Sequence, residues 1–190
     1  MNTPSPVALR LGRLKLLLIV GVFLAPVLVA AVLTLTGWQP RGRGNGMPVL
    51  PQRNLLAEHV AVILDDGVEW PWRDREPRMT LLALPGPDCA ARCFAALTGM
   101  TKAYLMLNHN QPRLRLLYVG VPPADPARDQ AMRRYWTLGR ERGRALDAYR
   151  AGAPDSVAAL LVESNGTVLS RYPAGFDVAG LAQDLQKVIR

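Results

Sequence analysis

The chain has few of the residues that build metal sites, because its 190 residues include only two cysteines and two histidines. No second Cys or His pair has the spacing of zinc ligands, so we do not expect a zinc site. The sequence also lacks internal repeats and a low-complexity tail, and aromatic residues make up only 6% of it. Aliphatic residues are abundant instead, which favours a compact α/β domain over a disordered chain.

One long hydrophobic run lies near the N-terminus. Residues 14–36 read LKLLLIVGVFLAPVLVAAVLTLT, in which Lys15 is the only charged residue. A helix needs about 20 apolar residues to cross a membrane, whereas the apolar region of a signal peptide has only about 7–15. We therefore expect one transmembrane helix over 14–36, which makes the membrane itself a partner of the chain.

The residues around this run predict the topology. The basic residues before it are Arg10, Arg13 and Lys15. Their charge predicts a cytoplasmic N-terminus over 1–13 and a single-pass helix in the inner (cytoplasmic) membrane. The four Gly and three Pro of segment 37–54 predict a linker without regular structure. A globular domain over 55–190 then faces the periplasm.

The formal net charge is +8, and much of the basic excess lies between Arg128 and Arg150. A basic surface can bind nucleic acid, anionic lipid or an acidic protein. We favour a solvated surface whose arginines pair partly with Asp129, Glu141 and Asp147, and we expect no nucleic-acid partner.

Apolar patterning predicts strands that alternate with helices in this domain. The predicted strands are 61–64, 78–84, 113–121, 157–162 and 167–172, and the predicted helices are 89–107, 126–148 and 178–189. Asn165-Gly166 predicts a hairpin turn, and Asp177 a helix cap. The order implies an α/β sheet with flanking helices, and a terminal hairpin followed by a helix is typical of a thioredoxin-like fold.

The two cysteines, Cys89 and Cys93, follow a predicted strand and open a helix in the segment LLALPGPDCAARCFAAL. Free N–H groups and the positive end of a helix dipole stabilise a thiolate at such a place, and Arg92 adds a positive charge. A thiolate is the reactive form in disulfide exchange and a soft ligand for copper(I). A structural disulfide or two inert thiols are the alternatives. We favour redox or metal chemistry.

Three segments together resemble the Sco (SenC) family of membrane-anchored thioredoxin-fold proteins. They are the Cys-x-x-x-Cys pair, LLYVGVPPADPARD at 116–129, and DSVAALLVESNGTVLSRYPAGFDVAGLAQDL at 155–185. The resemblance spans roughly residues 55–190. It implies copper delivery to cytochrome c oxidase, with Cys89 and Cys93 as copper ligands.

The sequence departs from this family at the third copper ligand, which is a histidine in the family. Counting back from Gly166 places Asp155 at that position. A carboxylate is a hard ligand and a poor replacement for imidazole at copper(I). The two histidines, His59 and His109, lie elsewhere, and we expect them in turns or on the surface.

Three functions therefore stay open. The leading one is an assembly factor for a copper-containing respiratory oxidase, whose cysteines form a redox pair, a copper(I) site or both. Its partner is cytochrome c oxidase or one of the oxidase's assembly factors. The second is a general thiol–disulfide oxidoreductase of the cell envelope, although Cys-x-x-x-Cys is not the usual Cys-x-x-Cys. The third is a non-catalytic anchored module, which the missing histidine favours.

Overall fold

The computed structural model describes residues 15, 19–29, 31–32 and 44–189, and the chain divides into two compact units at Arg43 and Gly44. In the first unit the described residues are helical and exposed. Among all described residues, no helix combines the length and the apolar character that a membrane span requires. The segments 1–13 and 37–43, and part of 14–36, lie outside the described residues, so the anchor stays a prediction.

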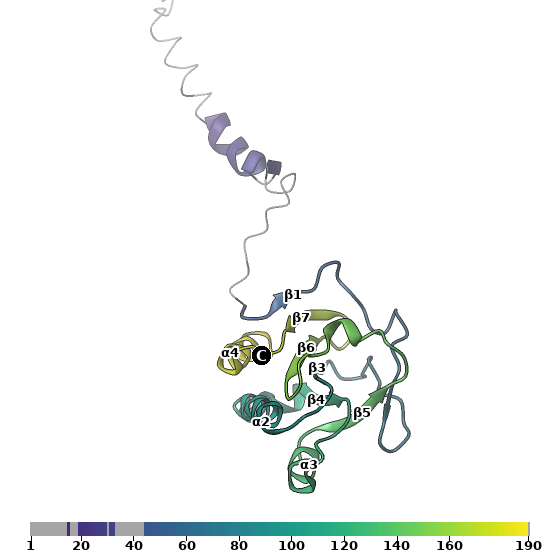
Figure 1. Cartoon of the computed structure of the whole chain (residues 1–190). Coiled ribbons are helices and arrows are strands. Elements are labelled where there is room, and N and C mark those ends of the chain that lie inside the picture. Colours follow the sequence, from purple (N-terminus) through teal and green to yellow (C-terminus); the bar gives the residue numbers. More distant parts are fainter. Residues whose placement is uncertain (1–14, 16–18, 30, 33–43, 190) are drawn as a thin grey trace, which may run out of the picture. The chain divides into compact units, whose positions relative to one another are not determined.

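The second unit is a seven-stranded mixed sheet with helices packed against it (Figure 1). The strands, in their order across the sheet, are β1 (Met47–Pro48), β7 (Val168–Tyr172), β6 (Val157–Val162), β3 (Met79–Pro85), β4 (Leu114–Val119), β5 (Thr137–Glu141) and β2 (Val62–Leu64). β3, β4 and β5 are parallel, and every other pairing is antiparallel. The helices are α2 (Ala91–Leu105), α3 (Pro126–Arg133) and α4 (Val178–Val188), with 3₁₀ turns η1 (Asn108–Arg113) and η2 (Asp147–Tyr149).

Both faces of the sheet are buried. Along β3, Leu81 and Ala83 belong to one hydrophobic cluster while Leu82 and Leu84 belong to the other, as the two-residue repeat of a strand requires. The first cluster takes its helical residues from α2, α3 and α4, namely Cys93, Leu97, Met100, Met132, Leu181 and Leu185. α2 is thereby fixed against the sheet, with its first turn beyond the C-terminal end of β3.

Most predicted elements are present within two residues of their expected bounds, and the α/β sheet with flanking helices is confirmed. The predicted helix over 126–148 is wrong beyond its first eight residues, since α3 ends at Arg133 and β5 follows. Glycine disfavours a helix, and a Cβ at Gly139 would lie 2.8 Å from Cγ1 of Val62. Gly139 therefore allows β2 to approach β5 closely, and this long-range pairing overrides local helix propensity.

A short strand also forms where we expected no regular structure. β1 lies inside the predicted linker 37–54 and pairs with β7. The buried carboxylate of Asp184 in α4 accepts the backbone N–H groups of Asn45 at 2.6 Å and Gly46 at 2.9 Å. These bonds hold the start of the second unit against α4, although the sequence around it is rich in Gly and Pro.

Candidate functional site

The two cysteines form a disulfide at the start of α2, with their Cα atoms 5.1 Å apart. β3 ends at Pro85, the segment 86–90 turns the chain, and α2 begins at Ala91. Cys89 is therefore just outside the helix and Cys93 is in its first turn. Cys89 is 7% exposed and Cys93 is fully buried, so a reaction partner can reach only the first sulfur.

α2 has no cap of its own, because its N-cap residue is Ala90, which makes no side-chain hydrogen bond. By contrast, Asp125 caps α3 and Asp177 caps α4 from within their own segments. The first N–H groups of a helix need an acceptor. Those of α2 find it in Asp155, which lies more than 60 residues later in the chain, just before β6.

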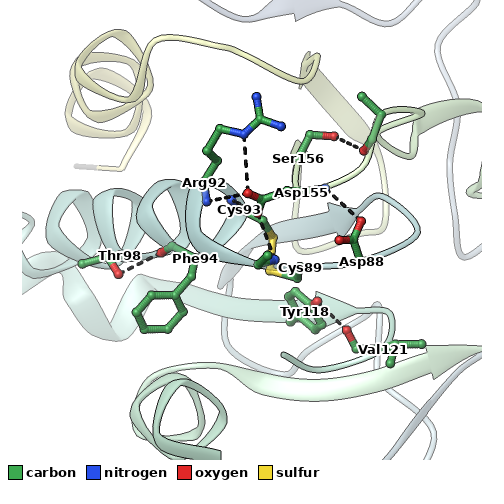
Figure 2. Close-up of a disulfide and its surroundings, with 12 residues drawn as sticks. Asp88, Cys89, Arg92, Cys93, Phe94, Thr98, Tyr118, Val121, Asp155 and Ser156 are labelled. Carbon is green, nitrogen blue, oxygen red and sulfur yellow. Dashed lines mark hydrogen bonds and ion pairs between the residues drawn. A yellow bond between two sulfur atoms is a disulfide. The ribbon is translucent and has the colours of Figure 1, made fainter. Parts of the chain in front are cut away.

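Asp155 binds the start of α2 through both carboxylate oxygens (Figure 2). Oδ1 accepts the N–H groups of Ala90 and Cys93, each at 2.9 Å. Oδ2 accepts the N–H of Arg92 at 3.0 Å and the Nε–H of the same residue at 3.4 Å. These donors, the Cys93 amide first, lower the pKa of Asp155 and keep it ionised at neutral pH.

The loop that carries Asp155 is fixed against the end of β3. The N–H of Asp155 donates to Oδ1 of Asp88 at 3.0 Å, and Gly86 donates its N–H to the Ser156 carbonyl at 2.9 Å. A Cβ at Gly86 would lie 2.2 Å from the Ala153 oxygen, so only glycine permits this approach. Sequence analysis missed Asp88, and the signal that it lay near a capping partner was a helix start without a capping residue.

The donor set beside the disulfide does not fit a metal ion. A carboxylate offers about four lone-pair positions, and Asp155 uses both oxygens for two N–H groups each. The described part of the chain contains no group of three or more Cys, His, Asp or Glu side chains suited to a metal. The structure brings Asp155 to the cysteines, as the family alignment of positions predicts, but it acts there as a helix cap.

The two histidines are far from the disulfide. His109 lies in η1, beyond the other end of α2, and 15 helical residues at about 1.5 Å each span about 22 Å. His59 follows Leu55, whose N–H donates to Gly166 in the β6–β7 turn. That turn is at the opposite end of β6 from Asp155, and six strand residues span about 20 Å.

The predicted pairing of the basic segment is confirmed for two of its arginines. Arg133 contacts Asp129 at 2.8 Å, and Arg150 contacts Glu141 and Asp147 at 3.4 Å each. These acidic side chains thus neutralise part of the excess charge between 128 and 150.

Two hollows lie near the site. One of about 220 Å³ is bordered by Arg92, Asp155 and Phe176, and a larger one of about 510 Å³ is bordered by Pro87 and Val121. Neither is lined by a cysteine, so size alone does not locate the chemistry. The smaller hollow shares Asp155 with the disulfide and therefore gives a partner segment room next to the reactive bond.

The chain is similar to known thioredoxin-like proteins. Residues 80–190 match the family model described as transmembrane-like, thioredoxin-like, C-terminal domain. None of the curated proteins matches the chain. Among solved structures, it is similar to apo Sco1 from Thermus thermophilus, with 18% identity and a TM-score of 0.54 over 79% of this chain and 99% of that one.

Two further Sco structures are similar at lower scores. BsSco has 14% identity and a TM-score of 0.48, over 75% of this chain and 95% of that one. Copper-bound ScoI from Arabidopsis thaliana has 15% identity and a TM-score of 0.48, over 76% of this chain and 97% of that one. At these identities the structural likeness concerns the fold, for which the Thermus protein supports a thioredoxin-like assignment.

Proposed function

Because the chain belongs to the family of transmembrane-like, thioredoxin-like C-terminal domains, we propose that it is a membrane-anchored thiol–disulfide redox protein. Cys89 and Cys93 are its redox pair. The observation that carries the proposal is a disulfide at a helix start beside a carboxylate whose oxygens are already taken by N–H donors. Such a site exchanges electrons through its sulfurs and offers copper no third ligand.

The exchange starts from the reduced pair. The Cys89 thiolate attacks one sulfur of a partner's disulfide, which forms a mixed disulfide and releases the partner's other sulfur as a thiolate. Cys93 then loses its proton to water and attacks Sγ of Cys89. This step closes the Cys89–Cys93 disulfide and releases the partner's second thiolate. The partner gains two electrons and two protons from water, and a dithiol donor of the envelope reduces the pair again.

We propose cytochrome c oxidase, or one of its assembly factors, as the partner. The sequence resemblance to the Sco family supports this, because BsSco is described as a member of a family of cytochrome c oxidase assembly proteins. Cysteines bind copper as thiolates, so a partner's copper site must be reduced before it is loaded. A reductant for that step needs no histidine.

The anchor and compartment belong to the same proposal. Residues 14–36 hold the chain in the inner membrane, 1–13 lie in the cytoplasm, and the domain over 55–190 works in the periplasm. The charge pattern at the N-terminus supports this orientation. An oxidising compartment is also where a disulfide such as Cys89–Cys93 persists.

Trapping of the mixed disulfide tests the redox function. The full-length chain, reduced and kept in mild detergent, is mixed with a synthetic peptide that contains one disulfide. We expect the wild type to release reduced peptide and C93A to accumulate a covalent adduct through Cys89. C89A should give neither product, because its remaining cysteine is buried. Equal adduct from both single variants, or no reaction of the wild type, contradicts the proposal.

A copper(I) titration of the same reduced chain, against a competing chelator, separates the alternatives. We expect no difference between the wild type and C89A/C93A in a range where a three-ligand site binds tightly. Tight one-to-one binding that the double variant loses would instead make the chain a copper carrier. A chain inactive in both assays would be a non-catalytic module.

A further inference from the structure

Asp155 occupies the donors that a reduced Cys89 needs, and this inference rests on the redox function proposed above. Counted from the N-cap Ala90, Arg92 and Cys93 supply the second and third N–H groups of α2. An N-cap side chain normally accepts from one of these two groups. Here the carboxylate of Asp155 accepts both.

Cys89 lies one residue before that N-cap. When the disulfide is reduced, a Cys89 thiolate depends on the same N–H groups and on the positive end of the helix dipole. The Asp155 carboxylate already holds these donors and places a like charge beside the sulfur. We infer that Asp155 is a positioning residue that biases the Cys89–Cys93 pair toward the disulfide by withholding these donors from a Cys89 thiolate.

Other ionisable groups at the site do not cancel this effect (Figure 2). Asp88 precedes Cys89 and adds a second carboxylate. Arg92 contacts Asp155 at 3.4 Å, but its side chain is 81% exposed, so water screens its charge. Tyr118 donates its hydroxyl to a backbone carbonyl at 2.7 Å, and burial raises its pKa, so it stays neutral.

The reduction equilibrium of D155N, measured at two pH values, tests the inference. Full-length wild type and variant are equilibrated in the same graded dithiothreitol buffers at pH 6 and pH 9, and the reduced fraction is measured by thiol alkylation. At pH 9 a cysteine with an ordinary pKa of about 8.5 is largely ionised. We expect D155N to favour the reduced form about tenfold more than the wild type there, which corresponds to about 30 mV.

At pH 6 the thiols of both proteins are protonated, so we expect their equilibria to coincide. This dependence on pH separates an effect on the thiolate from general loosening of the loop, which would shift both measurements equally. D177N is the matched control, because Asp177 caps α4 in the same chemical manner, through two N–H groups at 3.0 Å, and no cysteine lies on that helix. It should match the wild type at both pH values.

Coincident equilibria of wild type and D155N at pH 9, or an equal shift at both pH values, would overturn the inference. If D155N fails to fold, D155S replaces it, since its hydroxyl is neutral and can still accept one amide. The trapping experiment with C93A is independent of this comparison. A wild type that forms the mixed disulfide while D155N behaves identically would therefore refute the role of Asp155 alone.

Discussion

Asp155 and Asp177 perform the same task at two helix ends, but only Asp177 belongs to the helix that it caps. At Asp155 the cap joins two distant parts of the chain. Protonation of its carboxylate therefore weakens a tertiary contact as well as a helix end.

We predict that Asp155 makes stability depend on pH in the acidic range. Its folded-state pKa is lowered by the amides of Cys93 and Arg92, so its contribution is complete above the unfolded value of about 3.9 and is lost as the pH falls through the folded value. The melting temperature of D155N should be below that of the wild type at pH 6, and the two should converge near pH 2. Parallel curves from pH 6 to pH 2 would contradict this origin.

The sequence was sufficient to predict the cysteine pair, because its spacing and its place between a strand and a helix are local features. It was also sufficient to place Asp155 near the pair, through a resemblance in spacing. It was not sufficient to predict what Asp155 does there. That role depends on a loop more than 60 residues away that approaches α2 and on the missing cap at Ala90.

At the level of elements, the closest packing near the site is between the end of β3 and the loop before β6. Gly86 makes this approach possible, because its N–H donates to Ser156 and a side chain there would meet the backbone of Ala153. The position of Asp155 therefore depends on a glycine outside its own loop.

G86A should lower the free energy of unfolding by about 2 kcal/mol, the typical cost of overpacking. G152A is the matched control, because nothing lies within 4 Å of a Cβ at Gly152, and its effect should be below about 1 kcal/mol. Urea unfolding of both variants measures the difference. Equal values for G86A and G152A would show that the loop yields without cost.

The elements also show where local sequence misleads. The strands and α2 were predicted because their apolar repeats match their burial, as in β6, which is buried throughout. β5 was not predicted, because it is a strand only through its pairing with β4 and β2. Its own residues include a glycine and alternate with arginines, which reads equally well as a solvated helix.

At the level of the whole second unit, hydrophobic clusters on both faces of the sheet hold the fold. The disulfide joins residues only four positions apart. Closing so short a loop removes little freedom from the unfolded chain, about 2 kcal/mol in the chain-entropy account. The fold should therefore persist when the pair is reduced, as a redox cycle requires.

The variant C89S/C93S tests this expectation. We predict a cooperative unfolding transition with a free energy about 2 kcal/mol below that of the oxidised wild type, and close to that of the wild type reduced with dithiothreitol. Circular dichroism during urea unfolding measures all three. A variant without a cooperative transition would mean that the disulfide is needed for the fold, and a redox cycle through it would then unfold the domain.

The backbone of Asp155 has a φ of +48°, in the left-handed region. Among residues other than glycine, Asn, Asp and His adopt this region most readily. Position 155 is therefore a point at which evolution can exchange a carboxylate for an imidazole without reshaping the loop. The scaffold is neutral to that exchange, and its whole penalty falls on the uncapped start of α2. Relatives of this chain can thus diverge in sulfur and metal chemistry by one substitution, provided that a second change restores the cap.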